Sequence, residues 1–304
     1  MTIIQYWKVR GKTVIAIFDD AYDLILPQNA AFPFWYEGEM HGKDWEGKAK
    51  TVFMNPPPIT QFKWGLNMVK AIQVPSANLA KDWSKYNDTY YIHNYLDTSI
   101  YKLGEKMFPH PEDEIYIGWC GSLSHYPSFR DSQVAEALRT ISKRYPNVTV
   151  LIGGDQRVFD LINVKKKIFQ PHVPDEQWAS LLTSLDIAIA PLSGEYDKRR
   201  SWIKVLEYLY LKIPWVATNY PTYEEFSEFG VLTENGYKNW VTSLSMVIDN
   251  YPKYKEIVST KGYEFALEQT AEKNVAKITL PLYKKLIEQP YKIYEGNGNA
   301  HLRV

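Results

Sequence analysis

Short apolar runs alternate with amphipathic stretches over the last two thirds of the chain. The runs cover residues 115–120, 148–152, 187–190, 215–218 and 230–232. They do not alternate apolar with polar residues, and the stretches between them carry apolar residues at helical spacing. Such runs are typical of parallel strands that helices bury on both faces. We therefore expect an α/β domain with a parallel, Rossmann-like sheet over residues 112–270.

The first 111 residues show the same pattern incompletely. Strands are expected at residues 14–18, 71–74 and 89–93, and Ser76 is a suitable N-cap for a helix after the second of them. Three strands make half of a doubly wound domain. Residues 27–58 are rich in proline and are expected to form a long irregular insertion. The sequence thus predicts a truncated Rossmann-like lobe over residues 1–111.

Composition limits the classes of function. The 304 residues carry 35 basic and 35 acidic side chains, and this neutral balance argues against a nucleic-acid partner. Cys120 is the only cysteine, which excludes a disulfide framework and suits a reducing cytoplasm. No apolar run approaches the roughly 18 residues that span a bilayer. We expect a cytoplasmic protein without a transmembrane segment, and peripheral membrane contact stays open.

A charged segment before residues 215–218 carries the strongest chemical signal. It contains Arg199, Arg200, Lys204 and Glu207. The last three are spaced by four and three residues, so on a helix they share one face. Cations placed in this way suit a diphosphate, and the carboxylate suits a ribose diol. An internal ion pair on a solvated helix face is the alternative. We expect the cations to be partly exposed, so that their removal leaves the fold intact.

Several motifs in a fixed order resemble one enzyme family. They are Gly118-Trp119-Cys120-Gly121-Ser122, Asp186-Ile187-Ala188-Ile189-Ala190-Pro191-Leu192, Lys204-Val205-Leu206-Glu207-Tyr208 and Lys212-Ile213-Pro214-Trp215-Val216-Ala217-Thr218. In this order they are similar to the donor domain of the GT-B glycosyltransferases of glycosyltransferase family 4. The resemblance implies two Rossmann-like lobes, of which the N-terminal one is incomplete here. It also implies a helix over residues 271–289 that crosses back to this lobe, before a tail at 290–304.

The resemblance implies transfer of a sugar from a nucleotide-sugar donor to an acceptor hydroxyl, with retention of the anomeric configuration. Arg200 and Lys204 are then the catalytic cations, which neutralise the departing diphosphate. The donor-binding residues that it implies are Gly121, Ser122, Gly153, Gly154, His172, Val173, Arg199 and Glu207. No cofactor is expected. UDP- and GDP-linked donors both stay open, and so do sugar, lipid-linked and protein acceptors.

Two features depart from the family pattern. The family has a glutamate eight residues before the position of Glu207, and Arg199 stands there instead. The role of this family glutamate toward the donor sugar is unfilled here or has moved to Glu195 or Asp197. The short N-terminal lobe leaves an acceptor site that is open, rebuilt from residues 27–58, or completed by a partner chain. A noncatalytic module that binds a sugar nucleotide or a glycan is the alternative function.

Carboxylates follow the first expected strand. Asp19, Asp20 and Asp23 could serve a metal ion or the acceptor, and we favour the acceptor because the resembling enzymes generally need no metal. His93 ends the third strand. Together with Asp19, Asp20 and Glu195, it completes the set of residues that we expect to contact the acceptor or the sugar.

Overall fold

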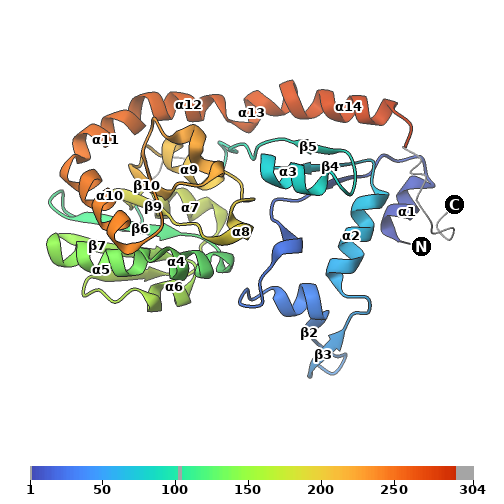
Figure 1. Ribbon diagram of the computed structural model, residues 1–304, viewed down its shortest axis with the longest axis horizontal. Helices are drawn as coiled ribbons and strands as arrows, with labels where there is room; N and C mark the ends of the chain where they lie inside the picture. The colour runs from blue at the N-terminus through green and yellow to red at the C-terminus, as the bar shows by residue number, and fades with distance from the viewer. Residues whose placement is uncertain (1, 102–104, 292–304) are drawn as a thin grey trace.

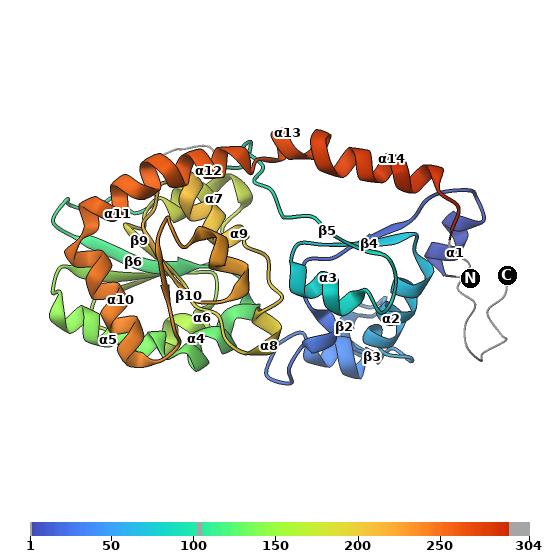
Figure 2. The ribbon, with the colours of Figure 1, turned by 45° about the horizontal axis from the view of Figure 1, so that its top comes forward.

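The structure is a computed structural model that describes residues 2–101 and 105–291 (Figure 1). It consists of a smaller N-terminal lobe, a larger lobe beside it, and a series of C-terminal helices that runs over both (Figures 1 and 2). Residues 292–304, most of the predicted tail, lie outside the described residues.

Six parallel strands form the sheet of the larger lobe. They are β6 (Ile115–Cys120), β7 (Val148–Gly153), β8 (Lys167–Gln170), β9 (Ile187–Ala190), β10 (Trp215–Thr218) and β11 (Val231–Thr233). Their order is β11-β10-β9-β6-β7-β8, the arrangement of a doubly wound dinucleotide-binding fold. The predicted α/β class and the strands predicted from apolar runs are confirmed. β8 escapes prediction because this edge strand is only half-buried and has Lys167 and Gln170 at its ends.

Helices cover both faces of this sheet. They are α4 (Tyr126–Ser132), α5 (Val134–Arg144), α6 (Gln156–Leu161), α7 (Asp175–Leu182), α8 (Gly194–Asp197), α9 (Ile203–Tyr210) and α10 (Tyr237–Asp249), with 3-10 turns η3 (Leu123–His125) and η4 (Pro221–Phe226). Successive residues of β9 enter opposite cores. Ile187 and Ile189 pack in the core that contains α5 and α10. Ala188 and Ala190 pack in the core that contains α7 and α9. Burial on both faces explains why this strand reads as a continuous apolar run.

The smaller lobe has a three-stranded parallel sheet in the order β1-β4-β5. Its strands β1 (Ile15–Ile17), β4 (Ala71–Val74) and β5 (Thr89–Tyr91) confirm the prediction. Ser76 caps α3 (Ala77–Trp83), since its hydroxyl accepts from the N–H of Leu79 at 3.3 Å. α2 (Pro58–Met68) packs on the sheet through Phe62 and Leu66. This parallel sheet thus has half as many strands as that of the larger lobe, and β1 forms one of its edges.

The insertion at residues 27–58 is more regular than the sequence indicates. It contains a π-helical turn η2 (Pro33–Glu37) and an antiparallel hairpin of β2 (Glu39–Lys43) and β3 (Ala49–Phe53). In Figure 1 this hairpin projects from the end of α2 away from the sheet. Most of its residues are exposed, so it lacks the one-sided apolar alternation by which strands are recognised. A 3-10 turn, η1 (Tyr22–Leu24), and α1 (Ile3–Lys8) complete the lobe.

The C-terminal helices connect the lobes. α11 (Tyr251–Ile257), η5 (Val258–Gly262) and α12 (Tyr263–Glu268) lie on the larger lobe, and α13 (Ala271–Asn274), η6 (Val275–Thr279) and α14 (Leu280–Glu288) run along the smaller one (Figure 2). Leu96 forms a parallel bridge with Thr270, between α12 and α13, where the C-terminal helices pass from the larger lobe to the smaller one. Further on, the Tyr283 hydroxyl donates to Oε1 of Gln73 on β4 at 2.7 Å. None of the helices in the described ranges has the length and apolar character to cross a membrane.

Gly118, in the middle of β6, has no room for a side chain. An ideal Cβ there would lie 1.8 Å from the carbonyl oxygen of Leu151 on β7. We predict that Gly118→Ala lowers the free energy of unfolding by about 3 kcal/mol, because two central strands must move apart. Gly42→Ala on β2 is the control, since nothing lies within 4 Å of its Cβ. Urea denaturation measures both variants, and equal stabilities would contradict the packing argument.

Candidate active site

The carboxyl ends of the two sheets meet at the boundary between the lobes. In the larger lobe the strand order reverses between β6 and β9, and doubly wound folds bind ligands at such a point. In the smaller lobe, a polar pocket of about 310 Å³ lies at the ends of β1, β4 and β5, and Asp19, Gln73 and Asn94 line it. The candidate residues of both lobes lie around this boundary.

Lys204 lies in the first turn of α9 and points to the end of β6. Its Nζ donates to the carbonyl oxygen of Cys120 at 2.6 Å. It also lies 5.6 Å and 5.8 Å from the ring centroids of Trp119 and Trp178. Burial lowers the pKa of the Lys204 ammonium, although the carboxylate of Glu207 opposes the shift. A cation that is partly desolvated in this way gains from a bound anion.

Arg200 is 8% exposed, and its guanidinium has partners on three elements. Nε donates to Oδ1 of Asp197 at 2.6 Å, and Nη1 donates to Oδ1 of Asp20 at 3.4 Å. Nη2 donates to the carbonyl and the hydroxyl of Ser124 at 3.2 Å and 3.1 Å. Burial alone would lower the pKa of Arg200, but the carboxylates of Asp197 and Asp20 outweigh it and raise the pKa. The guanidinium therefore stays charged.

Two expectations for this segment are wrong. α9 begins at Ile203, so Arg200 precedes the helix and does not share a helical face with Lys204 and Glu207. Arg200 is also buried, not partly exposed, because Asp197 and Asp20 pair with it in the interior. Its complete removal would leave carboxylates without their counter-charge and would destabilise the fold.

Glu207 on α9 is 6% exposed and already accepts two hydrogen bonds. Its Oε1 accepts from the Tyr101 hydroxyl at 2.5 Å and from Nε1 of Trp178 at 3.0 Å. Burial and the carboxylate raise the pKa of Tyr101, so that the phenol remains a donor. In the part of the chain that the structure describes, Oε2 accepts no hydrogen bond. The expected bond to a ribose stays a prediction, and Oε2 is the atom that can make it.

Glycines bring the ends of β6 and β7 together. The N–H of Gly121 donates to the carbonyl of Gly153 at 3.0 Å. Gly154 has a φ of +97°, and an ideal Cβ there would lie 2.0 Å from the carbonyl oxygen of Gly121. Close packing of the two turns therefore explains why glycine is present at these positions. The Ser122 hydroxyl lies 3.1 Å from that of Ser124, which links this turn to Arg200. Donor contacts by all four predicted residues of these turns stay a prediction.

His125, in η3 directly after this turn, is a site residue that nothing in the sequence singles out. It is 7% exposed, and its ring lies against Trp119 with centroids 5.4 Å apart. Its Nδ1 has no hydrogen-bond partner among the described residues. Burial, and then the charges of Arg200 and Lys204, lower its pKa well below the usual value. A buried ring nitrogen without a partner is costly unless a ligand or water satisfies it.

His172 and Val173 follow β8. His172 is exposed, whereas Val173 is 3% exposed and belongs to the core that contains Leu181. The N–H of Gly154 donates to the carbonyl of Gln170 at 2.8 Å, which places this loop beside the turn after β7. The loop thus lies next to the end of the sheet, and its expected contact with a nucleobase stays a prediction.

Arg199 contacts the smaller lobe, and Glu195 pairs with Arg199 within the larger lobe. Nε of Arg199 donates to Oδ2 of Asp82 on α3 at 2.7 Å, and Nη1 donates to Oε2 of Glu195 at 2.7 Å. The carbonyl of Arg199 accepts from the Ser76 hydroxyl at 2.7 Å. Glu195 also accepts from Lys198 at 2.5 Å. The structure gives both residues protein partners, and their expected donor and sugar contacts stay predictions.

Asp20 follows β1 and reaches across the boundary to Arg200. The Tyr196 hydroxyl of α8 also bonds its carboxylate, and burial raises the pKa of Asp20 although Arg200 opposes this. Asp19 accepts from the Tyr22 hydroxyl at 3.2 Å. Asp23 accepts from Nε1 of Trp83 at 3.1 Å, so the three carboxylates have different partners. Within the described ranges, no group of three or more His, Cys, Asp or Glu residues could hold a metal ion.

The comparisons with known proteins agree with this geometry. Residues 114–250, from the start of β6 to the end of α10, match the family described as glycosyl transferases group 1. The fold is that of a GT-B glycosyltransferase. The resemblance of the larger lobe to a glycosyltransferase donor domain is thereby confirmed, and the assignment to family 4 stays a prediction.

Solved structures resemble the chain in fold at low sequence identity. Alr3699/HepE from Anabaena, in complex with UDP and glucose, is 17% identical over 75% of this chain, with a TM-score of 0.56. Sucrose-phosphate synthase from Thermosynechococcus elongatus is 14% identical over 92% of this chain and 70% of its own, with a TM-score of 0.61. TarM from S. aureus is 14% identical over 91% of this chain, with a TM-score of 0.58. The chain spans 66% of the HepE chain and 51% of the TarM chain. No match to a curated protein sequence was found.

His93 lies two residues beyond β5 and stacks on Trp202 of the larger lobe. The ring centroids are 3.5 Å apart at an angle of 14°, and Nδ1 lies 3.0 Å from the Tyr91 hydroxyl. Burial lowers the pKa of His93 from 6.5 to about 4. Between these values the unfolded chain binds more protons than the folded one, so this group destabilises the fold as the pH falls from 6.5 toward 4.

We predict that His93→Phe weakens this pH dependence. Phenylalanine keeps a ring on Trp202 but cannot be protonated. The loss of unfolding free energy between about pH 7 and about pH 4.5 should be smaller in the variant by about 1 to 2 kcal/mol, a value discounted for partial exposure. Urea denaturation of both proteins at the two pH values measures the difference. The same pH dependence in both would show that His93 does not titrate with folding.

Proposed function

We propose that this protein transfers a sugar from a nucleotide-sugar donor to an acceptor hydroxyl. The observation that carries the proposal is the grouping of Arg200, Lys204 and His125 at the end of β6, at the switch point of a lobe that matches the glycosyltransferase family. Two cations and an unpartnered ring nitrogen suit a diphosphate. The HepE structure holds UDP and glucose, which supports a nucleoside diphosphate in this fold.

In this proposal the donor phosphates lie between these three residues, and Oε2 of Glu207 accepts from a ribose hydroxyl. The bond from the anomeric carbon to the diphosphate breaks, and a bond from that carbon to the acceptor oxygen forms. With retention, the departing diphosphate takes the acceptor proton. Arg200 and Lys204 stabilise the charge that develops on it. The rate enhancement therefore comes mainly from cations that are already in place.

The acceptor is assigned to the smaller lobe. The pocket at the ends of its strands has a volume of about 310 Å³ and is lined by Asp19, Gln73 and Asn94. This volume lies at the lower end of the range of ligand sites, about 300 to 1,000 Å³. Asp20 lies directly after Asp19 and contacts Arg200, which connects this pocket to the donor cations.

Lys204→Met tests the phosphate site. Methionine keeps an apolar stem between Trp119 and Trp178 and removes the charge, so UDP or GDP should bind about tenfold more weakly or worse. Arg200→Lys is the companion variant, because it keeps a counter-charge for Asp197 while losing the guanidinium fork. Calorimetric titration measures the affinities, with thermal unfolding as the control for folding. Wild-type affinity in Lys204→Met would contradict the assignment.

Turnover separates an enzyme from a binding module. Release of free nucleotide from a panel of UDP- and GDP-sugars should occur with the wild-type protein. It should fall by about 10²- to 10³-fold in Lys204→Met, as when a charge-stabilising group is removed from a transition state. Tight nucleotide binding without any release would favour the noncatalytic alternative.

Glu207→Gln tests the ribose contact. The amide keeps the shape but gives up a charge-assisted hydrogen bond, so UDP or GDP should bind about tenfold more weakly. Inorganic pyrophosphate lacks a ribose, and its affinity should not change. Tyr101→Phe is the control, since it removes a donor to Oε1 and leaves Oε2 free for the ribose. An equal loss of affinity for pyrophosphate would refute the ribose role.

A further inference from the structure

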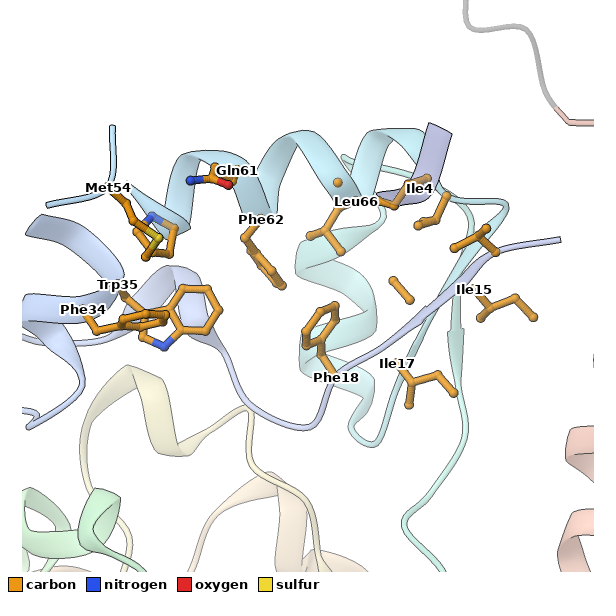
Figure 3. Close-up of a pocket in the computed structure, with 15 residues that line it drawn as sticks. Ile4, Ile15, Ile17, Phe18, Phe34, Trp35, Met54, Gln61, Phe62 and Leu66 are labelled. Carbon is orange, nitrogen blue, oxygen red and sulfur yellow. The ribbon is translucent and has the colours of Figure 1, made fainter. Parts of the chain in front are cut away.

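A second pocket in the smaller lobe is almost wholly apolar. It is a groove of about 550 Å³ between β1 and α2, lined among others by Ile15, Phe18, Trp35, Phe62 and Leu66. Figure 3 shows Phe18, Trp35, Phe62 and Leu66 around the space between β1 and α2. Gln61 carries the one amide or charged side chain that lines it, and its Nε2 already donates to the carbonyl of Pro56 at 2.8 Å. The groove therefore suits a hydrocarbon and not a sugar or a nucleotide.

The groove adjoins the acceptor pocket. Ile17 and Phe18, at the end of β1, line both of them. From there the groove follows β1 toward Ile4 of α1, away from the boundary between the lobes. The polar pocket and the apolar groove thus adjoin at Ile17 and Phe18. An elongated molecule with a polar end and an apolar end matches this pair of neighbouring sites.

We propose that the acceptor is an amphiphile, a hydroxyl-bearing head group on a hydrocarbon chain, with the head in the polar pocket and the chain in the groove. The proposal rests on the proposed function, because it names the class of acceptor for the same site. It also explains why the smaller lobe has an apolar surface along its β1 edge.

The surface of the lobe agrees with a substrate that comes from a lipid phase. Of the nineteen large apolar side chains that are exposed in the described ranges, twelve lie in residues 3–91 and three lie in residues 123–246. At the far end of the groove, α1 exposes Ile3 by 69% and Trp7 by 43%. Arg10 and Lys12 follow and are also exposed. Apolar side chains next to cations are typical of surfaces that contact lipid head groups.

A strand from another chain fits this edge less well. β1 offers only residues 15–17 for pairing, and the N–H of Val14 already donates to the Tyr291 hydroxyl at 3.0 Å. Strands commonly have about five or six residues, so a partner strand would gain few main-chain hydrogen bonds. The volume between β1 and α2 would also stay unfilled.

The test compares octyl β-D-glucoside, below its micelle concentration, with methyl β-D-glucoside, by calorimetry on the whole protein. Because each methylene removed from water favours binding, the octyl compound should bind the wild type at least about tenfold more tightly. Gly65→Phe should abolish this difference, because Gly65 lines the groove and its Cβ would meet only Ile4, at 3.4 Å. Gly65→Ala is the matched control that leaves the groove open. Ile17→Glu, at a residue that is 57% exposed, is a second variant that should lose the preference and keep the fold.

The outcomes separate this proposal from the one on which it rests. Equal affinity of the wild type for both glucosides, or an unchanged preference in Gly65→Phe and Ile17→Glu, would overturn it. So would a wild-type dimer that Ile17→Glu dissociates in sedimentation, since the groove would then be an interface between copies. UDP and GDP binding is measured in parallel and should not change in either variant. If the wild-type protein binds neither UDP nor GDP but still prefers the octyl glucoside, the proposed function would be wrong and the amphiphile site would remain.

Discussion

The buried guanidinium of Arg200 is the interaction on which the arrangement of this molecule depends. Its partners come from both lobes: Asp197 ends α8, Ser124 lies in η3, and Asp20 follows β1. Asp197 is fixed in turn by the hydroxyl of Ser128 at 2.5 Å and by the N–H of Ser193 at 2.8 Å. Removing one member of such a cluster leaves a buried charge without compensation. This charge cluster therefore fixes the turn before α9 and, together with the contacts of Arg199 to Ser76 and Asp82, joins the smaller lobe to it.

Where burial is two-sided, the fold could be predicted from the sequence. β6, β7, β9 and β10 read as apolar runs because helices cover both of their faces. The elements that were missed are exposed ones. β8 is half-buried along its length, and the hairpin of β2 and β3 exposes most of its residues, so neither leaves a clear apolar period. A sequence pattern records burial, and edge elements have little of it.

The site was predictable only as far as its residues are neighbours in the chain. The sequence singles out Arg200 and Lys204 because their charges cluster in the chain. The burial of Arg200 could not be found, since its partner Asp20 lies 180 residues away. Tyr101 binds Glu207 across 106 residues for the same reason. His125 carries no signal at all in the sequence, because its significance is an unpartnered nitrogen, and only the packing around it reveals that.

The two carboxylates that pair with Arg200, those of Asp197 and Asp20, are not equivalent. This difference bears on how a donor would bind. Asp197 accepts at 2.6 Å and is held by two further donors, whereas Asp20 accepts at 3.4 Å and has its pKa raised by burial. Asp20 is thus the weaker partner, and under the proposed function it is the one that a diphosphate displaces. Asp20 directly follows Asp19 in the chain, and Asp19 lines the acceptor pocket. Under the proposed function, the guanidinium that meets the donor is thus bonded to the residue next to the one that lines the acceptor pocket.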